Sequence, residues 1–135
     1  MEGRLAVQRS KVGELSFKYG THGPGYLVRG PFTDVGVIQL RPGDDYRNHY
    51  HAHSENAFLT LDGEVTLWSE CRDRFVLGPG DFHRCDPGEM HYFVNESATL
   101  WRAVFIRAPY DPADTIVVPW LPGDPLPDRP GSAER

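Results

Sequence analysis

Turn-forming residues interrupt this sequence so often that no long helix fits into it. Of its 135 residues, 14 are glycine and 12 are proline, and no segment repeats apolar residues at the period of a helix. The β-prone runs are short and lie between turn signals; they are 26–30, 34–40, 57–61, 64–69, 74–77, 91–94 and 99–106. Short strands spaced in this way are typical of a β-sandwich or β-barrel.

Charge and hydropathy exclude two classes of partner. The formal net charge is −5, and the chain has no long Lys or Arg run of the kind that nucleic-acid binding requires. No apolar run approaches the roughly 20 residues that span a bilayer. We therefore expect no nucleic-acid and no membrane partner. The N-terminus lacks the apolar stretch of a secretory signal, so we expect a cytoplasmic protein whose Cys71 and Cys85 are reduced thiols.

The end of the chain has a different composition from the rest. Seven of the 12 prolines lie between Pro109 and Pro130. Proline has no N–H to donate to a sheet, so residues 121–135 are predicted to form a mobile tail. The apolar run 115–120 before them is predicted to be an edge strand, or an arm that packs on a second subunit. This divides the chain into an N-terminal arm or edge strand (1–20), a β-barrel (21–110) and a Pro-rich extension (111–135).

Three histidines occupy alternate positions at His49, His51 and His53. Side chains of a strand alternate between its two faces, so the three share a face if they lie on one strand. His91 comes about 40 residues later on another predicted strand, and imidazole is a good ligand for zinc, iron, nickel or copper. The pattern His-x-His is a weak signal alone, because most histidines are structural or exposed. One alternative for His53 is a fourth ligand; the favoured one is that it caps the strand end or faces solvent.

Glycines stand at fixed distances from these histidines. Five residues separate Gly43 from His49, and Gly63 follows the next β-prone run. A second set with regular spacing comes later and consists of Gly80, Gly88, His91 and Asn95. The two sets resemble the two motifs of the cupin family. The second motif of that family has a proline where this chain has Asp86, with Pro87 one position later, and the turn chemistry survives this change.

The resemblance to cupins implies a fold, a cofactor and an assembly. Cupins are small β-barrels of the double-stranded β-helix (jelly roll) type with a metal near the centre. We therefore expect an all-β cupin-type barrel with a Pro-rich C-terminal tail. The matching positions imply one divalent metal ion per chain, held by His49, His51 and His91. Many cupins are homodimers, and we expect a homodimer here.

The carboxylate of the first cupin motif has no clear counterpart. The gap of three residues after His51 leads to Glu55 and the gap of four leads to Asn56, whereas six residues back from Gly63 lead only to Asn56. Three alternatives follow. A bulge between Glu55 and Gly63 would turn Glu55 toward the metal; otherwise Asn56 faces it in a three-histidine site, or the site has lost its metal. Asn56 fits both counts, so a neutral three-histidine site is favoured.

The same alternation of faces predicts the wall of a substrate pocket. If Asn56 points inward, Phe58 and Thr60 do so too, and Phe93 shares the face of His91. Each of these residues is explained equally well as barrel core. A pocket lined in this way suits a small, partly apolar anion. An arginine would pair with its carboxylate, and the sequence offers Arg29, Arg41, Arg47 and Arg102.

The predicted ligand set favours one class of reaction. Three neutral imidazoles leave the full charge of a divalent metal, which attracts anionic ligands. In this respect the chain resembles the three-histidine cupins that are thiol or diketone dioxygenases. We therefore predict a mononuclear Fe(II) dioxygenase that acts on a small organic acid or phenolic compound. With zinc, manganese or nickel the site would instead suit an isomerase, decarboxylase or cyclase, and a cupin that binds a metabolite without catalysis is the third alternative.

Overall fold

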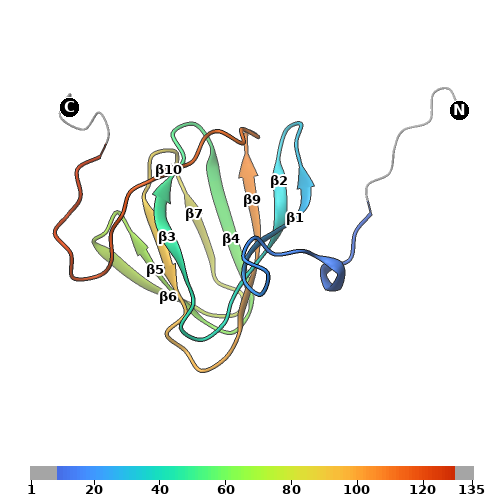
Figure 1. Cartoon of the computed structure of the whole chain (residues 1–135), viewed down its shortest axis with the longest axis horizontal. Coiled ribbons are helices and arrows are strands. Elements are labelled where there is room, and N and C mark those ends of the chain that lie inside the picture. The colour runs from blue at the N-terminus through green and yellow to red at the C-terminus, as the bar shows by residue number, and fades with distance from the viewer. Residues whose placement is uncertain (1–8, 130–135) are drawn as a thin grey trace, which may run out of the picture.

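The computed structural model describes residues 9–129, and nearly all of the regular structure in this range is β (Figure 1). A single turn of 3₁₀ helix, η1 (Val12–Glu14), precedes the strands. The strands are β1 (Gly23–Arg29), β2 (Asp34–Leu40), β3 (Asp45–Tyr50), β4 (Glu55–Asp62), β5 (Val65–Ser69), β6 (Asp73–Leu77), β7 (Phe82–Cys85), β8 (His91–Val94), β9 (Trp101–Ala108) and β10 (Ile116–Val117). No helix in the described range is long and apolar enough to cross a membrane.

The strands form two antiparallel five-stranded sheets that face each other (Figure 1). Their orders are β1-β2-β9-β4-β7 and β10-β3-β8-β5-β6. One apolar cluster joins them, with Ile38 and Trp101 from the first sheet and Leu67 and Phe93 from the second. All four of these side chains are buried, so the core lies between the sheets. The predicted all-β jelly roll is confirmed.

Two strands, β3 and β7, were absent from the runs that the sequence predicts as β-prone. Their sequences are DYRNHY and FHRC, which contain few of the apolar and β-branched residues that mark a strand. β3 pairs with β8 at the wall of the barrel, and its inward positions carry Tyr46 and His49 rather than aliphatic side chains. Hydrophobic patterning therefore overlooks strands such as these two, which carry few aliphatic side chains.

The C-terminal extension packs on the barrel as far as the structure describes it. β10 pairs with β3 of its own chain, Ile116 opposite Tyr50, so the apolar run forms the predicted edge strand. The Trp120 ring lies against Trp68, with 5.7 Å between ring centroids. Arg129 donates hydrogen bonds to the Gly88 carbonyl and the Glu70 carboxylate. Within the predicted tail, Arg129 therefore contacts the barrel. Residues 130–135 and 1–8 lie outside the described range.

Two turn glycines allow a matched test of the backbone geometry. Gly63 follows β4 with φ +71°, and a Cβ there would lie 2.2 Å from the Leu100 carbonyl oxygen. Gly43 has φ +86° but nothing within 4 Å of a Cβ. Gly63→Ala should lower the free energy of unfolding by about 3 kcal/mol or more, and Gly43→Ala by about 1 kcal/mol, because only the first adds a clash to the backbone strain. Urea unfolding measures both; equal losses would contradict the geometry.

Candidate metal centre

Three histidine side chains meet inside the barrel. His49 lies near the end of β3, His51 follows just after that strand, and His91 begins β8 directly opposite His49. One ring nitrogen of each lies within 4.8 Å of those of the other two. All three residues are buried, His91 completely. The structure thus brings together the three residues predicted as ligands, while His53 lies exposed on the following loop.

Main-chain carbonyls determine which nitrogen of each ring is protonated. Nδ1 lies 2.7 Å from the Arg47 oxygen in His49, 2.5 Å from the Asp114 oxygen in His51, and 3.0 Å from the Glu89 oxygen in His91. A carbonyl can only accept, so each Nδ1 donates its proton and each Nε2 keeps a lone pair. The Nε2 of His91 is buried with no hydrogen-bond partner. A buried lone pair without a partner fits a metal ion.

Burial also keeps the three imidazoles neutral. It lowers the pKa of His49 to about 3 against the partly offsetting hydrogen bond to the Arg47 carbonyl. Burial likewise lowers the pKa of His51 and, far more, that of His91. Neutral imidazole is the form that binds metals. The cluster therefore offers uncharged nitrogen ligands at neutral pH.

Of the two residues considered for a fourth position, the structure places only Asn56 beside the histidines. Its Nδ2 donates to the Nε2 of His51 at 3.3 Å, and its Oδ1 is buried without a hydrogen-bond partner. Glu55 faces outward, where its carboxylate lies 3.5 Å from the Arg84 Nε. β4 does have a register shift, but between Thr60 and Asp62. That irregularity lies beyond the inward residues of β4 and leaves Glu55 on the outer face.

Asp114, far along the chain, holds the loop that follows His51. Its carboxylate accepts hydrogen bonds from the main-chain N–H groups of Ala52, His53 and Ser54 at 2.7, 2.8 and 2.9 Å. Its own carbonyl is the acceptor for His51 Nδ1. Nothing in the local sequence marks this residue, because its role arises only when the C-terminal extension returns to β3.

A pocket of about 530 Å³ opens above His49 and His51. Asn56 and Phe58 line it, and it is further walled by the aromatic residues Phe17, Tyr26, Tyr46 and Phe105. Two predicted wall residues, Thr60 and Phe93, are instead in the core beneath it. Thr60 accepts a hydrogen bond from Trp101 Nε1 at 3.0 Å, and Phe93 stacks on the same indole at 5.3 Å. Thr60 and Phe93 were wrongly predicted to line the pocket because alternation along a strand predicts the face of a residue but not its depth in the barrel.

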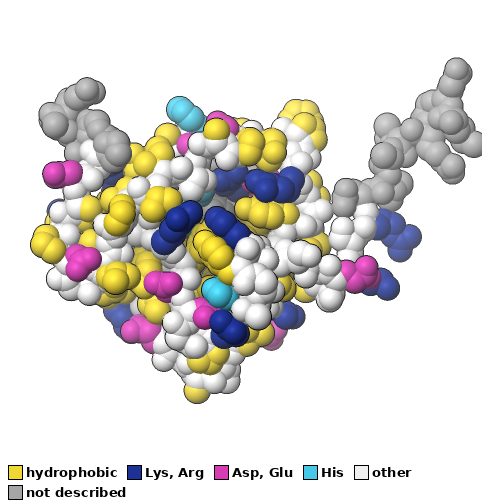
Figure 2. Space-filling view, in the orientation of Figure 1, with side chains coloured by type: hydrophobic (Ala, Val, Ile, Leu, Met, Phe, Trp, Pro, Cys, Tyr) yellow, Lys and Arg dark blue, Asp and Glu magenta, His cyan; other side chains and the backbone are white. Residues whose placement is uncertain are grey.

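Positive side chains outnumber negative ones around this pocket. Asp34 is the one acidic residue among the described lining residues, whereas the basic ones are Lys18, Arg29, Arg47 and Arg107. In Figure 2, Lys and Arg side chains gather around the middle of the face shown. Of the arginines that the sequence offers, Arg29 and Arg47 line the pocket. The other two are paired elsewhere, Arg41 with Asp44 and Arg102 with Gln39.

Asp34 and Arg107 were missed as site residues. Both are buried, and the Arg107 Nη2 lies 2.9 Å from the Asp34 Oδ2. Arg107 Nη1 also lies 3.3 Å from His51 Nδ1. After burial, the positive charge of this guanidinium lowers the pKa of His51 further and so disfavours a charged ring. A signal for Arg107 was present, because it continues the inward positions of Trp101 and Phe105 along β9.

The role of Asp114 can be measured by removing its carboxylate. Asp114→Ala leaves three loop N–H groups without their acceptor, so we expect the free energy of unfolding to fall by about 2–3 kcal/mol. Asp111→Ala removes a nearby carboxylate that accepts only the exposed Ala113 N–H and should cost below about 1 kcal/mol. Chemical denaturation of both variants gives the comparison, and similar losses would show that Asp114 has no special part.

Comparisons with known proteins agree with this geometry. Residues 36–107 match the cupin domain family. A segment of 71 residues is 28% identical to quercetin 2,3-dioxygenase of Bacillus subtilis, covering 52% of this chain but only 21% of that protein. A double-stranded β-helix protein of Klebsiella pneumoniae superposes with a TM-score of 0.72 at 20% identity, covering 83% of this chain and 97% of that one.

KdgF of a Halomonas species superposes with a TM-score of 0.59 at 16% identity, covering 66% of this chain and 79% of that one. These two structures support the fold alone. The family match covers more than half of the chain and includes all three histidines. The chain therefore belongs to the cupin domain family.

Proposed function

We propose that this protein is a mononuclear Fe(II) dioxygenase that acts on a small organic acid or phenolic compound. The observation that carries the proposal is the convergence of three neutral imidazoles at the inner end of a pocket lined by aromatic and basic side chains. In the proposal His49, His51 and His91 hold one divalent ion through Nε2, and Asn56 borders it. A ferrous ion in this position would supply the chemistry that activates dioxygen.

The side chains of the pocket have two tasks in this proposal. Uncharged ligands leave the metal its full charge, so an anionic oxygen of the substrate is drawn to the inner end. Arg47 and Lys18 line the pocket and add positive charge toward which a carboxylate would turn. Phe58 and Tyr46 offer flat apolar surface to an aromatic ring and exclude water from it.

The likeness to quercetin 2,3-dioxygenase supports this class of reaction. Because the chain spans only 21% of that protein's length, the substrate of the relative is not transferred. The proposal rests on the ligand set and the pocket, and the sequence likeness adds to both.

One observation favours a second function, a reaction without oxygen at a zinc, manganese or nickel ion. Asp34 lines the pocket and is fully buried. It forms an ion pair with Arg107, but neither of its carboxylate oxygens has a hydrogen-bond partner of good geometry. A carboxylate in that position would take a proton from a substrate whose oxygen is bound to the metal, as an isomerase, decarboxylase or cyclase requires. Such an enzyme would form product under anaerobic conditions.

The exposed apolar residues on the outer face of the first sheet support a homodimer. Leu59 and Phe82 stand opposite each other on β4 and β7, and Ile106 lies on the same outer face. We propose that a second copy of the chain covers this patch. Sedimentation of the wild type should show a dimer and that of Leu59→Glu a monomer; a wild type that sediments as a monomer at micromolar concentration would contradict it.

The metal site is tested first by metal content. After equilibrium dialysis against Fe(II) without oxygen, the wild type should hold one iron per chain. His91→Ala should lower the affinity at least about 100-fold, because one of three ligands is lost. Glu55→Ala should bind like the wild type, since that carboxylate faces outward, and it serves as the matched control. Loss of iron in Glu55→Ala would favour the alternative in which Glu55 faces the metal.

The reaction class is tested by oxygen uptake. The iron-loaded protein is mixed with a panel of small phenolic and aliphatic acids in an oxygen-electrode cell. We expect uptake that depends on substrate and on iron and that Asp34→Asn does not abolish. Product formed without oxygen by the zinc- or manganese-loaded protein, and lost in Asp34→Asn, would instead establish the second function. Tight binding of a panel compound with no turnover under either condition would indicate a binding protein.

A further inference from the structure

A second group of potential metal ligands lies at the edge of the barrel, apart from the three histidines. His83 and Cys85 stand two residues apart on β7, and Glu89 comes from the turn that follows this strand. One donor atom of each lies within 4.8 Å of those of the other two. We propose that His83, Cys85 and Glu89 form a second metal site of the protein, one that takes zinc.

The geometry requires only small side-chain movements. Zinc binds nitrogen, oxygen and sulfur ligands at about 2.0–2.3 Å in a tetrahedron, so ligand atoms around it lie about 3.3–3.7 Å apart. The three donor atoms here already lie within 4.8 Å, and His83 Nε2 is 3.0 Å from the Glu89 Oε2. All three residues belong to β7 and the turn after it, so one short segment of the chain provides the whole set of ligands.

This site differs from the histidine cluster in the metal that its ligands prefer. A thiolate prefers zinc to ferrous iron, whereas three imidazoles accept several metals. Imidazole, thiolate and carboxylate together carry a charge of −2, which neutralises a zinc ion. The two sites would therefore select different metals in the same barrel.

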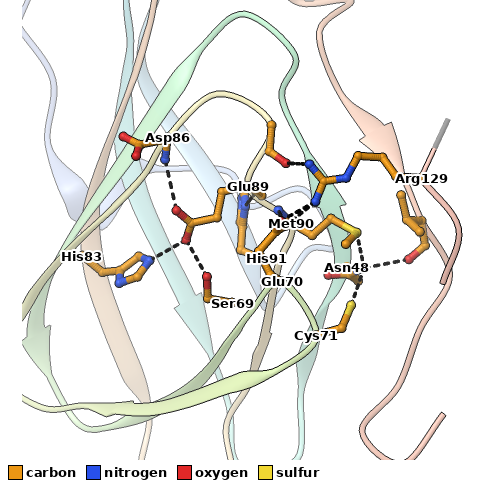
Figure 3. A network of polar contacts seen from close by, with 12 residues as sticks. Asn48, Ser69, Glu70, Cys71, His83, Asp86, Glu89, Met90, His91 and Arg129 are labelled. Carbon is orange, nitrogen blue, oxygen red and sulfur yellow. Dashed lines mark hydrogen bonds and ion pairs between the residues drawn. The ribbon is translucent and has the colours of Figure 1, made fainter. Parts of the chain in front are cut away.

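Glu89 is held in place as an anion. Figure 3 shows its carboxylate in contact with His83, Ser69 and the main-chain N–H of Asp86. Ser69 Oγ donates at 2.9 Å and the Asp86 amide at 3.3 Å. Contacts from three segments of the chain therefore fix the carboxylate beside Cys85 before any metal binds.

Cys85 enters the site as a thiol. Burial and, after it, the charge of Glu89 raise the pKa of Cys85, so the sulfur keeps its proton while no metal is bound. When zinc binds, the S–H bond breaks, its electron pair forms the zinc–sulfur bond, and the proton leaves to the buffer. No oxidant or reductant takes part in this step.

Access for a metal is available from the outside. β7 is the edge strand of its sheet. The side chains of His83 and Glu89 are 19% and 18% exposed, while Cys85 lies beneath them at 1%. A zinc ion would enter past the first two and reach the sulfur last, with its fourth position left open to water.

The test counts zinc in the full chain with the first site disabled. We expect His91→Ala to retain one zinc per chain after equilibrium dialysis, and His91→Ala/Cys85→Ser to retain less than about a tenth of one. His91→Ala/Cys71→Ser is the matched control, because Cys71 is the other buried cysteine and lies outside this group; it should keep its zinc. The proposal is overturned if His91→Ala holds no zinc, or if His91→Ala/Cys85→Ser keeps its zinc.

A spectroscopic measurement distinguishes loss of the zinc site from loss of the fold. Cobalt(II) in place of zinc should give a thiolate-to-metal charge-transfer band in the near ultraviolet in the wild type and in Cys71→Ser, but not in Cys85→Ser. Circular dichroism confirms that the variants keep their β structure. The hydrogen bonds among His83, Ser69 and Glu89 are a purely structural network if the wild type shows no such band. The result does not depend on oxygen uptake, so the two proposals fail separately.

Discussion

Three hydrogen bonds from imidazole Nδ1 to main-chain carbonyls are the interactions on which the centre of this protein depends. They leave the lone pair of each ring on Nε2, although no ring carries a charge. In His91 that Nε2 is buried without a hydrogen-bond partner. The acceptors come from three places, β3 itself, the turn before β8 and the C-terminal extension. Since a carbonyl has no alternative role, the tautomer of each ring is fixed by the fold rather than by pH or by a titrating neighbour.

The barrel interior changes character from one end to the other. At the closed end, Phe93 and Trp101 stack in the apolar core. At the open end, one row of directly paired residues crosses the first sheet and consists of Asp34, Arg107 and Asn56. This row is polar because it faces the pocket, and the buried Asp34–Arg107 pair offsets part of the cost of charges there. The histidines lie where the two environments meet.

Much of this arrangement was predictable because it follows from the spacing of two sequence motifs and from the alternation of faces along strands. The resemblance of the glycine and histidine spacing to the cupin motifs predicted that His49, His51 and His91 would converge, and counting against the first motif from both sides favoured Asn56 over Glu55. Depth was not predictable: Thr60 and Phe93 have the inward orientation expected of them but lie below the pocket. Arg107 could have been found by extending the inward positions of β9, because a charged residue at an inward position indicates a functional site.

Asp114 could not have been found in this way. Its partners lie about 60 residues earlier, and only the return of the chain as β10 brings them together. The same holds for Arg129, whose contact with Gly88 joins the end of the described chain to the turn before His91. Proline-rich composition predicts the absence of regular structure, but contacts made by single side chains between the prolines leave no periodic signal.

The residues that match the cupin domain family are therefore not all the residues that form the histidine site and its pocket. The matched segment ends at residue 107 and contains every histidine of the cluster. Asp114, which provides the acceptor for His51 and holds the adjacent loop, lies outside it, and Lys18 of the pocket wall lies before its start. A fragment cut at the limits of the family match would keep all three histidines and lose part of what orients them. In this chain, the segment that matches the family is shorter than the segment whose residues form the site.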